Sequence, residues 1–196
     1  MFEIIRIITI IFNVMEFKIV KDNKKSLRER SKDIELPLSD EIITLGHQMI
    51  EYLKNSQDEE YLKAHPKVRS GVGLACPQIG KNINMVAIYF KDEENKETKF
   101  VLVNPKIISE STKLQYLSGG EGCLSVDGDH PGLVYRPYRI KVKCFDLLKN
   151  EPKEYVFTDY LAIVAGHEID HLKGILFYDH IDKQNPFKEI PGALKI

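Results

Sequence analysis

The sequence predicts an α+β domain in which short antiparallel or mixed sheets surround a central helix that carries a His-Glu-x-x-His motif. Two kinds of observation support this prediction. Many short segments are rich in strand-forming residues or alternate between apolar and polar residues, as half-buried strands do. Only two segments repeat apolar residues at helical spacing. Many short strands with two helices are typical of an α+β fold, and 196 residues suffice for one such domain.

Two segments have helical periodicity. Residues 40–54 carry an apolar stripe, and Ser39 before them is a suitable N-cap. Residues 159–172 show the same periodicity, with Thr158 or Asp159 as the cap. The first stripe is ordinary core, whereas the second helix holds the motif on which the functional argument depends.

Strands are expected in several short segments that lie between polar loops. The predicted strands are 17–20, 84–89, 100–103, 106–108, 113–117, 134–145 and 153–157. Residues 56–70 are charged and read as a loop with a helical turn, and residues 92–97 read as a hairpin loop. The connection 119–137 is rich in Gly, Asp and Pro and is long for a loop, and such loops are often functional.

The composition excludes some functional classes. Lys and Arg number 28 and Asp and Glu number 29, so no broad charge points to nucleic acid or an acidic membrane. The three cysteines, Cys76, Cys123 and Cys144, have no regular spacing and do not resemble a disulfide framework. We therefore expect a reducing compartment, the cytoplasm, where a cysteine thiolate can bind a metal.

The N-terminal segment 1–17 is rich in Ile and Phe. Glu3, Arg6 and Asn13 interrupt it, so it does not reach the ~18 apolar residues of a membrane span, and no cleavage site follows. Three interpretations stay open: an extra strand or arm, an upstream over-read before a true start at Met15, and a membrane anchor.

The histidines of the motif, His167 and His171, lie four residues apart in the second predicted helix. This spacing puts both imidazoles on one face, one turn apart, where a single ion can bridge them. Glu168 beside them can take a proton from a metal-bound water. Two chance surface histidines are the alternative, which apolar neighbours such as Ile163 and Leu172 weaken, since burying unpaired polar groups is costly. The motif therefore predicts a metal-dependent hydrolase.

A catalytic metal site needs a third protein ligand and an open position for water. One class of zinc proteases has a third histidine six residues after the second, but Phe177 stands there. In another class a downstream glutamate is the ligand, a part that Glu189 can fill, with His180 as a further candidate. Cys123 is the remaining option, because the glycines before it allow close backbone approach and a thiolate completes a Cys/His/His set.

A second glycine-rich segment runs from Gly71 to Gln78. It lacks the spacing of a dinucleotide or phosphate loop, and Pro77 would break a following helix. No general base is tied to Cys76, so a cysteine nucleophile is not supported. Taken alone, this segment predicts a tight turn.

Three runs occur in a fixed order: Gly71-x-Gly73-Leu74-Ala75-x-Pro77-Gln78, Glu121-Gly122-Cys123-Leu124-Ser125 and His167-Glu168-x-Asp170-His171. In this combination the chain resembles the peptide deformylases, over about residues 17–187. Runs at 125–127, 130–132 and 174–179 resemble the longer of the bacterial subgroups. The resemblance implies a single catalytic domain at 17–196, preceded by an N-terminal extension at 1–16 of unclear role.

The resemblance also implies a role for individual residues. The implied metal ligands are Cys123, His167 and His171, and Glu168 is the implied general acid and base. The implied oxyanion donors are the side-chain amide of Gln78 and the backbone N–H of Leu124. The implied substrate-binding residues are Gly71, Val72 and Gly73, which would pair with the substrate backbone as an added strand, and Val72, Ile163 and Val164, which match positions of the methionine pocket.

The activity of the family is removal of the formyl group from N-formylmethionine at the start of new proteins. Its usual metal is ferrous iron, which nickel, cobalt or zinc can replace. The resemblance therefore implies an iron-binding hydrolase of protein biosynthesis that modifies the N-terminus of nascent chains at the ribosome. We expect a cytoplasmic monomer with no direct nucleic-acid motif and no membrane contact.

Three positions depart from the family pattern. Cys76 stands where Ala is usual, and an exposed thiol there would be open to oxidation. Gly166 replaces a Gln, so a hydrogen bond that supports the metal ligands would be missing or supplied by water. Leu133 stands where the subgroup often has Tyr, which alters the outer substrate groove.

Two rival interpretations stay open at the level of the sequence. One is a zinc endopeptidase that uses Glu189 or His180 as its third ligand. The other is not enzymatic: a structural metal site, or an inactive relative that binds nascent chains.

Overall fold

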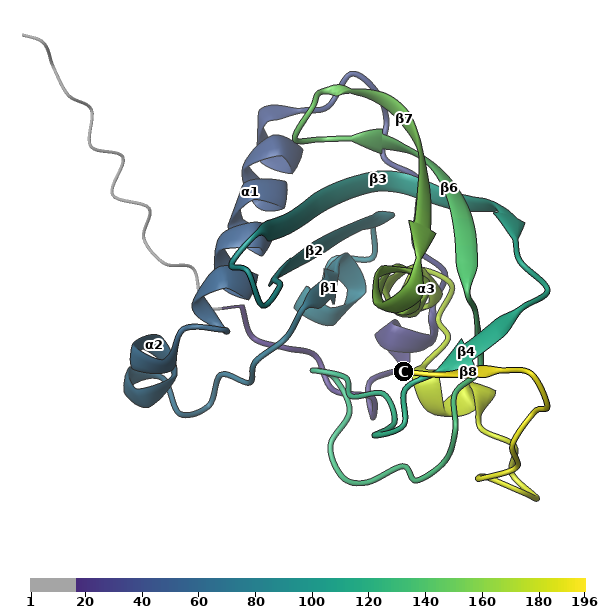
Figure 1. Cartoon of the computed structure of the whole chain (residues 1–196). Coiled ribbons are helices and arrows are strands. Elements are labelled where there is room, and N and C mark those ends of the chain that lie inside the picture. Colours follow the sequence, from purple (N-terminus) through teal and green to yellow (C-terminus); the bar gives the residue numbers. More distant parts are fainter. Residues whose placement is uncertain (1–16) are drawn as a thin grey trace, which may run out of the picture.

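The computed structural model describes residues 17–196 and has an α+β fold (Figure 1). Its α-helices are α1 (Asp40–Asn55), α2 (Glu59–Ala64) and α3 (Asp159–His171), and its 3-10 helices are η1 (Lys25–Arg28), η2 (Cys76–Ile79) and η3 (Phe177–His180). Its strands are β1 (Gly73–Ala75), β2 (Met85–Lys91), β3 (Glu97–Glu110), β4 (Leu114–Tyr116), β5 (Arg136–Pro137), β6 (Arg139–Asp146), β7 (Glu151–Thr158) and β8 (Leu194–Lys195). The predicted fold class is confirmed.

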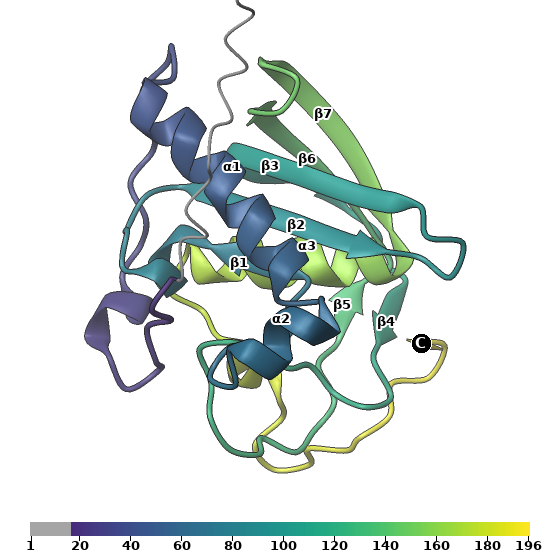
Figure 2. The ribbon, with the colours of Figure 1, turned by 90° about the vertical axis from the view of Figure 1, so that its left-hand side faces the viewer.

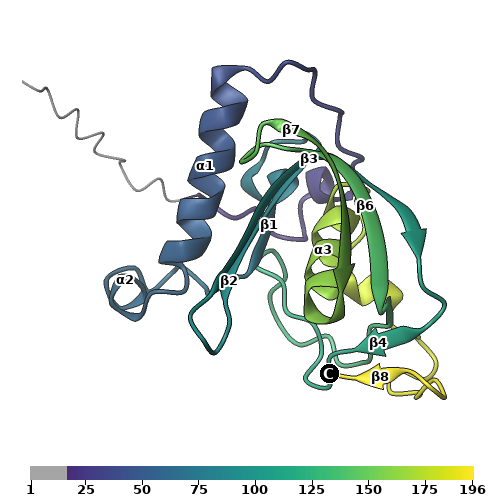
Figure 3. The same ribbon diagram turned by 45° about the horizontal axis from the view of Figure 1, so that its top comes forward.

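The larger sheet has the strand order β1-β2-β3-β6-β7, and each neighbouring pair is antiparallel. It curves around α3, which lies on its concave side (Figures 1 and 3). α1 covers the opposite, convex side (Figure 2). The helix with the histidine motif is therefore central, as the sequence predicts.

Each side of this sheet buries its own apolar cluster, and β2 contributes to both. Met85, Ala87 and Tyr89 pack in the cluster under α1, whereas Val86 and Ile88 pack in the cluster under α3. Because successive side chains of a strand point to opposite faces, a strand covered on both sides reads as a continuous apolar run. Burying one such large side chain contributes about 1.5–3 kcal/mol, so one cluster holds α1 and the other holds α3 firmly against the sheet.

The position of α3 explains why its sequence is apolar on nearly every side. All residues from Ala162 to His171 are buried. Ala162, Ala165 and Ile169 pack against the sheet. His167 and His171 have their partners in the glycine-rich loop, at Glu121 and Cys123, whereas the Glu168 side chain lies against Gly73 of β1.

The smaller sheet has the order β5-β4-β8, in which β4 is antiparallel to β5 and parallel to β8. The chain pairs its last residues with the segment that precedes the glycine-rich loop. The Ser118 N–H donates to the Ile196 carbonyl at 2.9 Å, and the Ile196 N–H donates to the Tyr116 carbonyl at 2.9 Å. The prediction that mixed pairing occurs is confirmed.

The helix boundaries agree well with the sequence, because they depend on local signals. α1 begins at Asp40, and the Ser39 hydroxyl accepts a hydrogen bond from the Ile42 N–H at 3.4 Å. α3 begins at Asp159 after Thr158, whose side chain makes no cap bond. The predicted helical turn within 56–70 is α2.

Three strand predictions were wrong. The segment 134–145 is not one strand, because β5 belongs to the smaller sheet and β6 to the larger one. Residues 17–20 form no strand, although the Val20 N–H donates to the Gln78 carbonyl at 2.8 Å. The segments 100–103 and 106–108 are not separate, because β3 continues through Pro105. Register shifts against β6 between Val103 and Lys106 accommodate this residue, which has no N–H for the ladder.

The expectations for residues 1–16, including a start at Met15, lie outside the described residues. Within 17–196, no helix combines the length and the apolar character that a membrane crossing requires.

Candidate active site

Cys123, His167 and His171 come together although two loops and a helix separate them in the sequence. One candidate ligand atom from each lies within 4.8 Å of the others, and all three residues are buried. The Cys123 Sγ is 3.3 Å from the His171 Nε2. Within residues 17–196, this is the group of His, Cys, Asp and Glu side chains whose geometry suits a metal ion.

The surroundings of this group favour a cation. Burial lowers the pKa of His171 well below 6.5, so this imidazole is neutral and offers a lone pair. Burial also lowers the pKa of His167, but its hydrogen bonds to Cys123 and Glu121 raise it more, to about 10. Positive charge is thus stabilised at His167 by its partners Cys123 and Glu121, and a set of one sulfur and two imidazoles suits a first-row transition metal. The residues present therefore fit a divalent metal ion.

Glu121 and Arg136 orient the first histidine. The Glu121 Oε2 lies 2.7 Å from the His167 Nδ1, which leaves the Nε2 for a metal. Arg136 donates to both oxygens of Glu121, at 2.5 Å from its Nε and 2.9 Å from its Nη2. Burial raises the pKa of Glu121, but His167 and Arg136 lower it more, so the carboxylate stays ionised.

The rival third ligands, His180 and Glu189, do not reach this group. The His180 Nε2 lies 2.8 Å from the Asp170 Oδ2, so it binds this carboxylate and is not part of the group of possible metal ligands. The Glu189 Oε1 lies 3.5 Å from the Tyr116 hydroxyl. The structure therefore brings Cys123 to the two histidines, and not the ligands that the endopeptidase interpretation requires.

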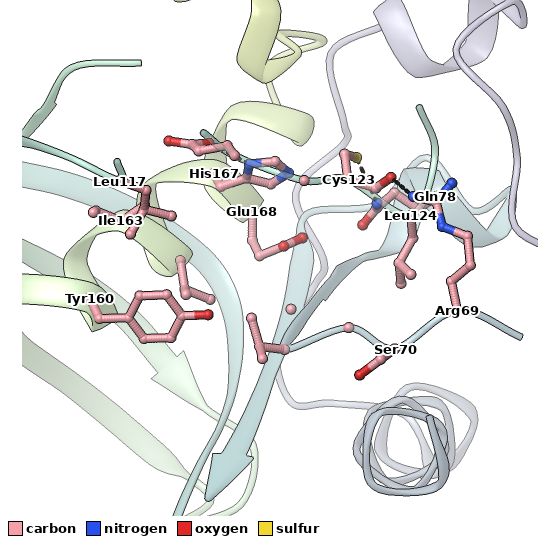
Figure 4. A pocket seen from close by; sticks show the side chains of 16 residues that line it. Arg69, Ser70, Gln78, Leu117, Cys123, Leu124, Tyr160, Ile163, His167 and Glu168 are labelled. Atoms are coloured by element: carbon pink, nitrogen blue, oxygen red, sulfur yellow. Dashed lines mark hydrogen bonds and ion pairs between the residues drawn. The ribbon is translucent and has the colours of Figure 1, made fainter. Parts of the chain in front are cut away.

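Glu168 points into a pocket beside the histidines (Figure 4). Its Oε2 is buried and has no hydrogen-bond partner, and burial raises the pKa of the carboxyl to about 7. A Cβ atom at Gly73 would lie 2.3 Å from the Glu168 Oε1, so this position needs glycine for close approach. A buried, unpaired carboxyl that titrates near neutrality can take up and release a proton.

Gln78 is held by its own turn. Its Oε1 accepts a hydrogen bond from the Ala75 N–H at 2.7 Å, so its amide nitrogen must point the other way. That Nε2 lies 3.5 Å from the Cys123 Sγ. The segment expected to be a tight turn is thus strand β1 followed by η2, with Pro77 in the first turn of the 3-10 helix.

The pocket has a volume of about 290 Å³, near the lower end of the ~300–1,000 Å³ of small-molecule sites. Ten predicted site residues line it: Gly71, Val72, Gly73, Gln78, Cys123, Leu124, Ile163, Val164, His167 and Glu168. His171 lies behind Cys123, outside the lining. The pocket contains both the polar groups and the apolar wall that the sequence predicts.

Sequence reasoning missed several residues of the site. Tyr160 lines the pocket and lies three residues before Ile163, on the same helix face, which was a usable signal. Leu117 also lines it, but β4 brings it there and no local pattern predicts this. The role of Arg136 could have been inferred only indirectly, because a buried carboxylate such as Glu121 requires a cation as its partner.

The three departures from the family pattern have structural consequences. Cys76 is fully buried and its Sγ lies 3.7 Å from the Met49 Sδ, so the thiol is not exposed. A Cβ at Gly166 would lie 3.3 Å from the Arg136 Nη1, which occupies the place of a larger side chain. Leu133 is half-buried, and its N–H donates to the Pro186 carbonyl at 2.8 Å.

The chain is similar to known proteins over most of its length. The family model described as polypeptide deformylase matches residues 16–187. The peptide deformylase of Listeria welshimeri is 49% identical over 168 residues, which cover 86% of this chain and 91% of that protein. Peptide deformylase 2 of Bacillus subtilis is 47% identical over 178 residues, which cover 91% and 96%.

Solved structures have a similar fold. A probable peptide deformylase from Synechococcus phage S-SSM7 has a TM-score of 0.69 and 33% identity, over 85% of this chain and 100% of that chain. A class I type b peptide deformylase from Acinetobacter baumannii, solved with Met-Ala-Ser bound, has a TM-score of 0.67 and 27% identity, over 86% and 99%.

Proposed function

The chain belongs to the polypeptide deformylase family, whose members hydrolyse the formyl group from N-formylmethionyl nascent polypeptides, and we propose that the pocket at Glu168 carries out this reaction. The protein is therefore a metal-dependent hydrolase that releases formate. One juxtaposition supports this assignment most directly: the Glu168 carboxyl with its unpaired oxygen and the oriented Gln78 amide line one pocket, beside the three residues that fit a metal ion.

We propose Cys123, His167 and His171 as the metal ligands and Fe²⁺ as the native metal, with Ni²⁺, Co²⁺ or Zn²⁺ as substitutes. A metal ion bound there acts as a Lewis acid and lowers the pKa of water to roughly 7, which makes a nucleophile available at neutral pH. The thiolate of Cys123 adds negative charge and softness, which favours a transition metal over Mg²⁺ or Ca²⁺.

Glu168 is the proposed general acid and base. Its free oxygen accepts the proton of the attacking water and later donates it to the nitrogen of the departing amine. Two features support this role: the Oε2 has no competing partner, and burial keeps the pKa of the carboxyl near 7.

The proposed oxyanion donors are the Gln78 Nε2 and the Leu124 N–H. Negative charge develops on the formyl oxygen as its carbon becomes tetrahedral, and preorganised donors stabilise that charge. The Ala75 N–H holds the Gln78 amide so that its nitrogen faces the site, without reorganisation during the reaction.

The substrate backbone is proposed to pair with residues Gly71–Gly73. These residues lead into β1, which is an edge strand of the larger sheet and has one side open for an added strand. The methionine side chain would fill the apolar part of the pocket at Val72, Ile163 and Val164, together with Leu117 and Tyr160. The related Acinetobacter enzyme was solved with Met-Ala-Ser bound, a peptide that begins with methionine.

The wider context follows from the substrate. We propose one catalytic domain over 17–196 and a monomer that acts on nascent chains beside the ribosome in the cytoplasm. The free cysteines support a reducing compartment. Residues 1–16 are proposed to be an extension outside the catalytic unit.

A pair of substrates and one variant test this function. Formyl-Met-Ala should be hydrolysed and acetyl-Met-Ala should not, because the extra methyl group crowds the pocket beside Glu168. Glu168→Ala should retain its metal, measured by elemental analysis, and lose turnover by about 10²–10⁴-fold. Full activity of this variant would show that the acid and base is another group.

A further inference from the structure

The turn that contains the cysteine ligand is held from outside at four consecutive carbonyls. Arg69 donates through its Nη2 to the Cys123 carbonyl and through its Nη1 to the Val126 carbonyl, the latter at 3.0 Å. The Lys21 Nζ donates to the Leu124 carbonyl at 3.1 Å. The Asp22 N–H donates to the Ser125 carbonyl at 2.9 Å.

One of these contacts acts on the peptide unit that faces the reaction. The carbonyl of Cys123 and the N–H of Leu124 belong to the same planar peptide group. Arg69 binds the carbonyl end, and Figure 4 shows its guanidinium reaching Cys123 from the edge of the pocket. Because the group is planar, a bond that fixes the direction of the carbonyl also fixes the direction of the N–H.

The charge of the guanidinium has a second effect. A charged donor makes a stronger hydrogen bond than a neutral one. Hydrogen bonds in series polarise one another, so a cation at the carbonyl makes the N–H of the same peptide a better donor. An arginine suits this position, since one guanidinium reaches two carbonyls of the turn.

We propose that Arg69 is a positioning residue for the oxyanion donor of this enzyme: it orients and polarises the Cys123–Leu124 peptide, and Lys21 holds the following peptide in the same turn. The inference rests on the proposed role of the Leu124 N–H. It assigns a functional effect to two cations that contact neither the proposed metal ligands' side chains nor Glu168.

The ion pairs of these cations are not the source of the effect. The Asp127 Oδ1 lies 2.9 Å from the Arg69 Nη1 and 2.7 Å from the Lys21 Nζ. The Asp127 side chain is 64% exposed and that of Arg69 is 46% exposed, so water screens these pairs strongly. The bonds to the turn carbonyls are the contacts that reach the active site.

The kinetic test compares Arg69→Met with Asp127→Asn. Arg69→Met should lower kcat for formyl-Met-Ala about tenfold, a part of the ~10²–10³-fold cost of losing an oxyanion donor. KM and metal content should change less than twofold, as expected for a group that acts on the transition state. Arg69→Lys should recover part of kcat, and Asp127→Asn should stay close to the parent.

A spectroscopic test needs no turnover. In the zinc-loaded and in the metal-free protein, Arg69→Met should shift the carbonyl ¹³C resonance of Cys123 and move the amide proton of Leu124 upfield. Lys21→Met should shift the carbonyl resonance of Leu124 and lower kcat by a smaller factor. Lys18→Met, a matched loss of an exposed cation three residues away, should change neither resonance nor kcat.

The outcomes separate this inference from the proposed function. An increase in KM alone for Arg69→Met would make Arg69 a substrate-binding residue and overturn the inference. Unchanged kcat in both Arg69→Met and Lys21→Met would overturn it as well, provided that Gln78→Ala is slow. If Gln78→Ala were also fully active, the proposed oxyanion donors themselves would be wrong. If Arg69→Met does not fold, Lys21→Met serves as the test variant, because the Lys21 side chain is partly exposed and its replacement is less disruptive.

Discussion

The carboxylate of Glu168 lies against Gly73 and occupies the place where a side chain at residue 73 would be. A Cβ at residue 73 would be 2.3 Å from the Glu168 Oε1 and 2.6 Å from its Cδ. β1 is paired with β2 in the sheet and α3 is buried, so both backbones are held in place. A side chain at Gly73 must therefore displace the carboxylate.

Gly73→Ala should lower kcat/KM by about 10²-fold, the typical cost of a ~1 Å displacement of a reacting group. The measurement is steady-state kinetics on formyl-Met-Ala, with a thermal melt to confirm folding. Gly119→Ala is the matched control, because no atom lies within 4 Å of a Cβ there. Activity of Gly73→Ala within twofold of the parent would contradict the close contact.

The buried thiol of Cys76 makes the stability of the folded protein depend on pH in the alkaline range. Burial raises the pKa of its thiol from 9.0 to about 12. The folded state therefore favours the neutral thiol, and this contribution to stability is fully present below pH 9 and is lost as the pH rises from 9 toward 12. The same argument applies to Cys144, whose pKa burial also raises to about 12.

Cys76→Ala should remove the part of the alkaline loss of stability that comes from this thiol. Between pH 8 and pH 10 the parent should lose about 1.4 kcal/mol more of its free energy of unfolding than the variant, the equivalent of one pH unit. Urea denaturation at the two pH values measures the difference. Cys144→Ala should behave alike, and equal losses in parent and variants would mean that these thiols titrate as in water.

At the scale of elements, Arg136 connects the glycine-rich loop to α3. Its guanidinium binds Glu121 in the loop and, at 2.9 Å, the Asp170 Oδ2 on the helix. All three side chains are buried or nearly so, and Arg136 lowers the pKa of both carboxylates against the effect of burial. The loop that brings Cys123 is thus tied to the helix that carries the histidines.

Arg136→Met should lower the free energy of unfolding by about 3–5 kcal/mol, because it leaves two buried carboxylates without their cation. The free energy of unfolding of Arg136→Lys should lie between those of the parent and Arg136→Met, since a single ammonium cannot reproduce the two-pronged hydrogen bonding of the guanidinium. Urea denaturation at pH 7 measures both effects.

The control uses an ion pair at the surface. Lys141 pairs with Glu154 between β6 and β7 at 2.6 Å, and these side chains are 38% and 45% exposed. Lys141→Met should change the free energy of unfolding by less than ~1 kcal/mol. Equal effects of Lys141→Met and Arg136→Met would show that burial does not determine the contribution of the Arg136 network.

At the scale of the whole molecule, a bound metal should stabilise the fold. The three proposed ligands come from a loop and from α3, so we expect the ion to bind only when both are in place. Metal at ~100 times its Kd adds about 2.7 kcal/mol to the free energy of unfolding. Dialysis against a chelator should therefore lower Tm, and added Zn²⁺ or Ni²⁺ should restore it.

Two variants show which side chains hold the ion. Cys123→Ser should abolish the metal-dependent rise in Tm, and Glu189→Gln should keep it. The reverse pattern would favour the endopeptidase arrangement, in which Glu189 is the third ligand.

Much of the fold was open to prediction because helix signals are local. Ser39 caps α1 through a side chain three residues from its partner, and the apolar stripe of α1 marks its buried face. Strand limits were less accurate. No local sequence signal indicates that β3 continues through Pro105, because the register shifts that allow it depend on β6.

In the candidate site, too, local features were predictable from the sequence and long-range contacts were not. The spacing of His167 and His171 on one helix predicts a shared face without knowledge of the fold. In contrast, Cys123 meets His171 across 48 positions, Arg136 meets Asp170 across 34, and Arg69 meets Cys123 across 54. Such contacts depend on how the loops return to the helix.

The sequence by itself determined the α+β class, the two long helices and the three motifs from which the chemistry was inferred, because periodicity, caps and short spacings act within a few residues. Only the tertiary structure decided which cations satisfy Glu121 and Asp170 and which donors hold the turn at Leu124, and it brings Cys123, the third ligand that the family resemblance implied, to the two histidines. These choices belong to the fold because a buried charge or carbonyl takes its partner from whichever segment packs beside it, and the order of the residues along the chain does not specify that neighbour.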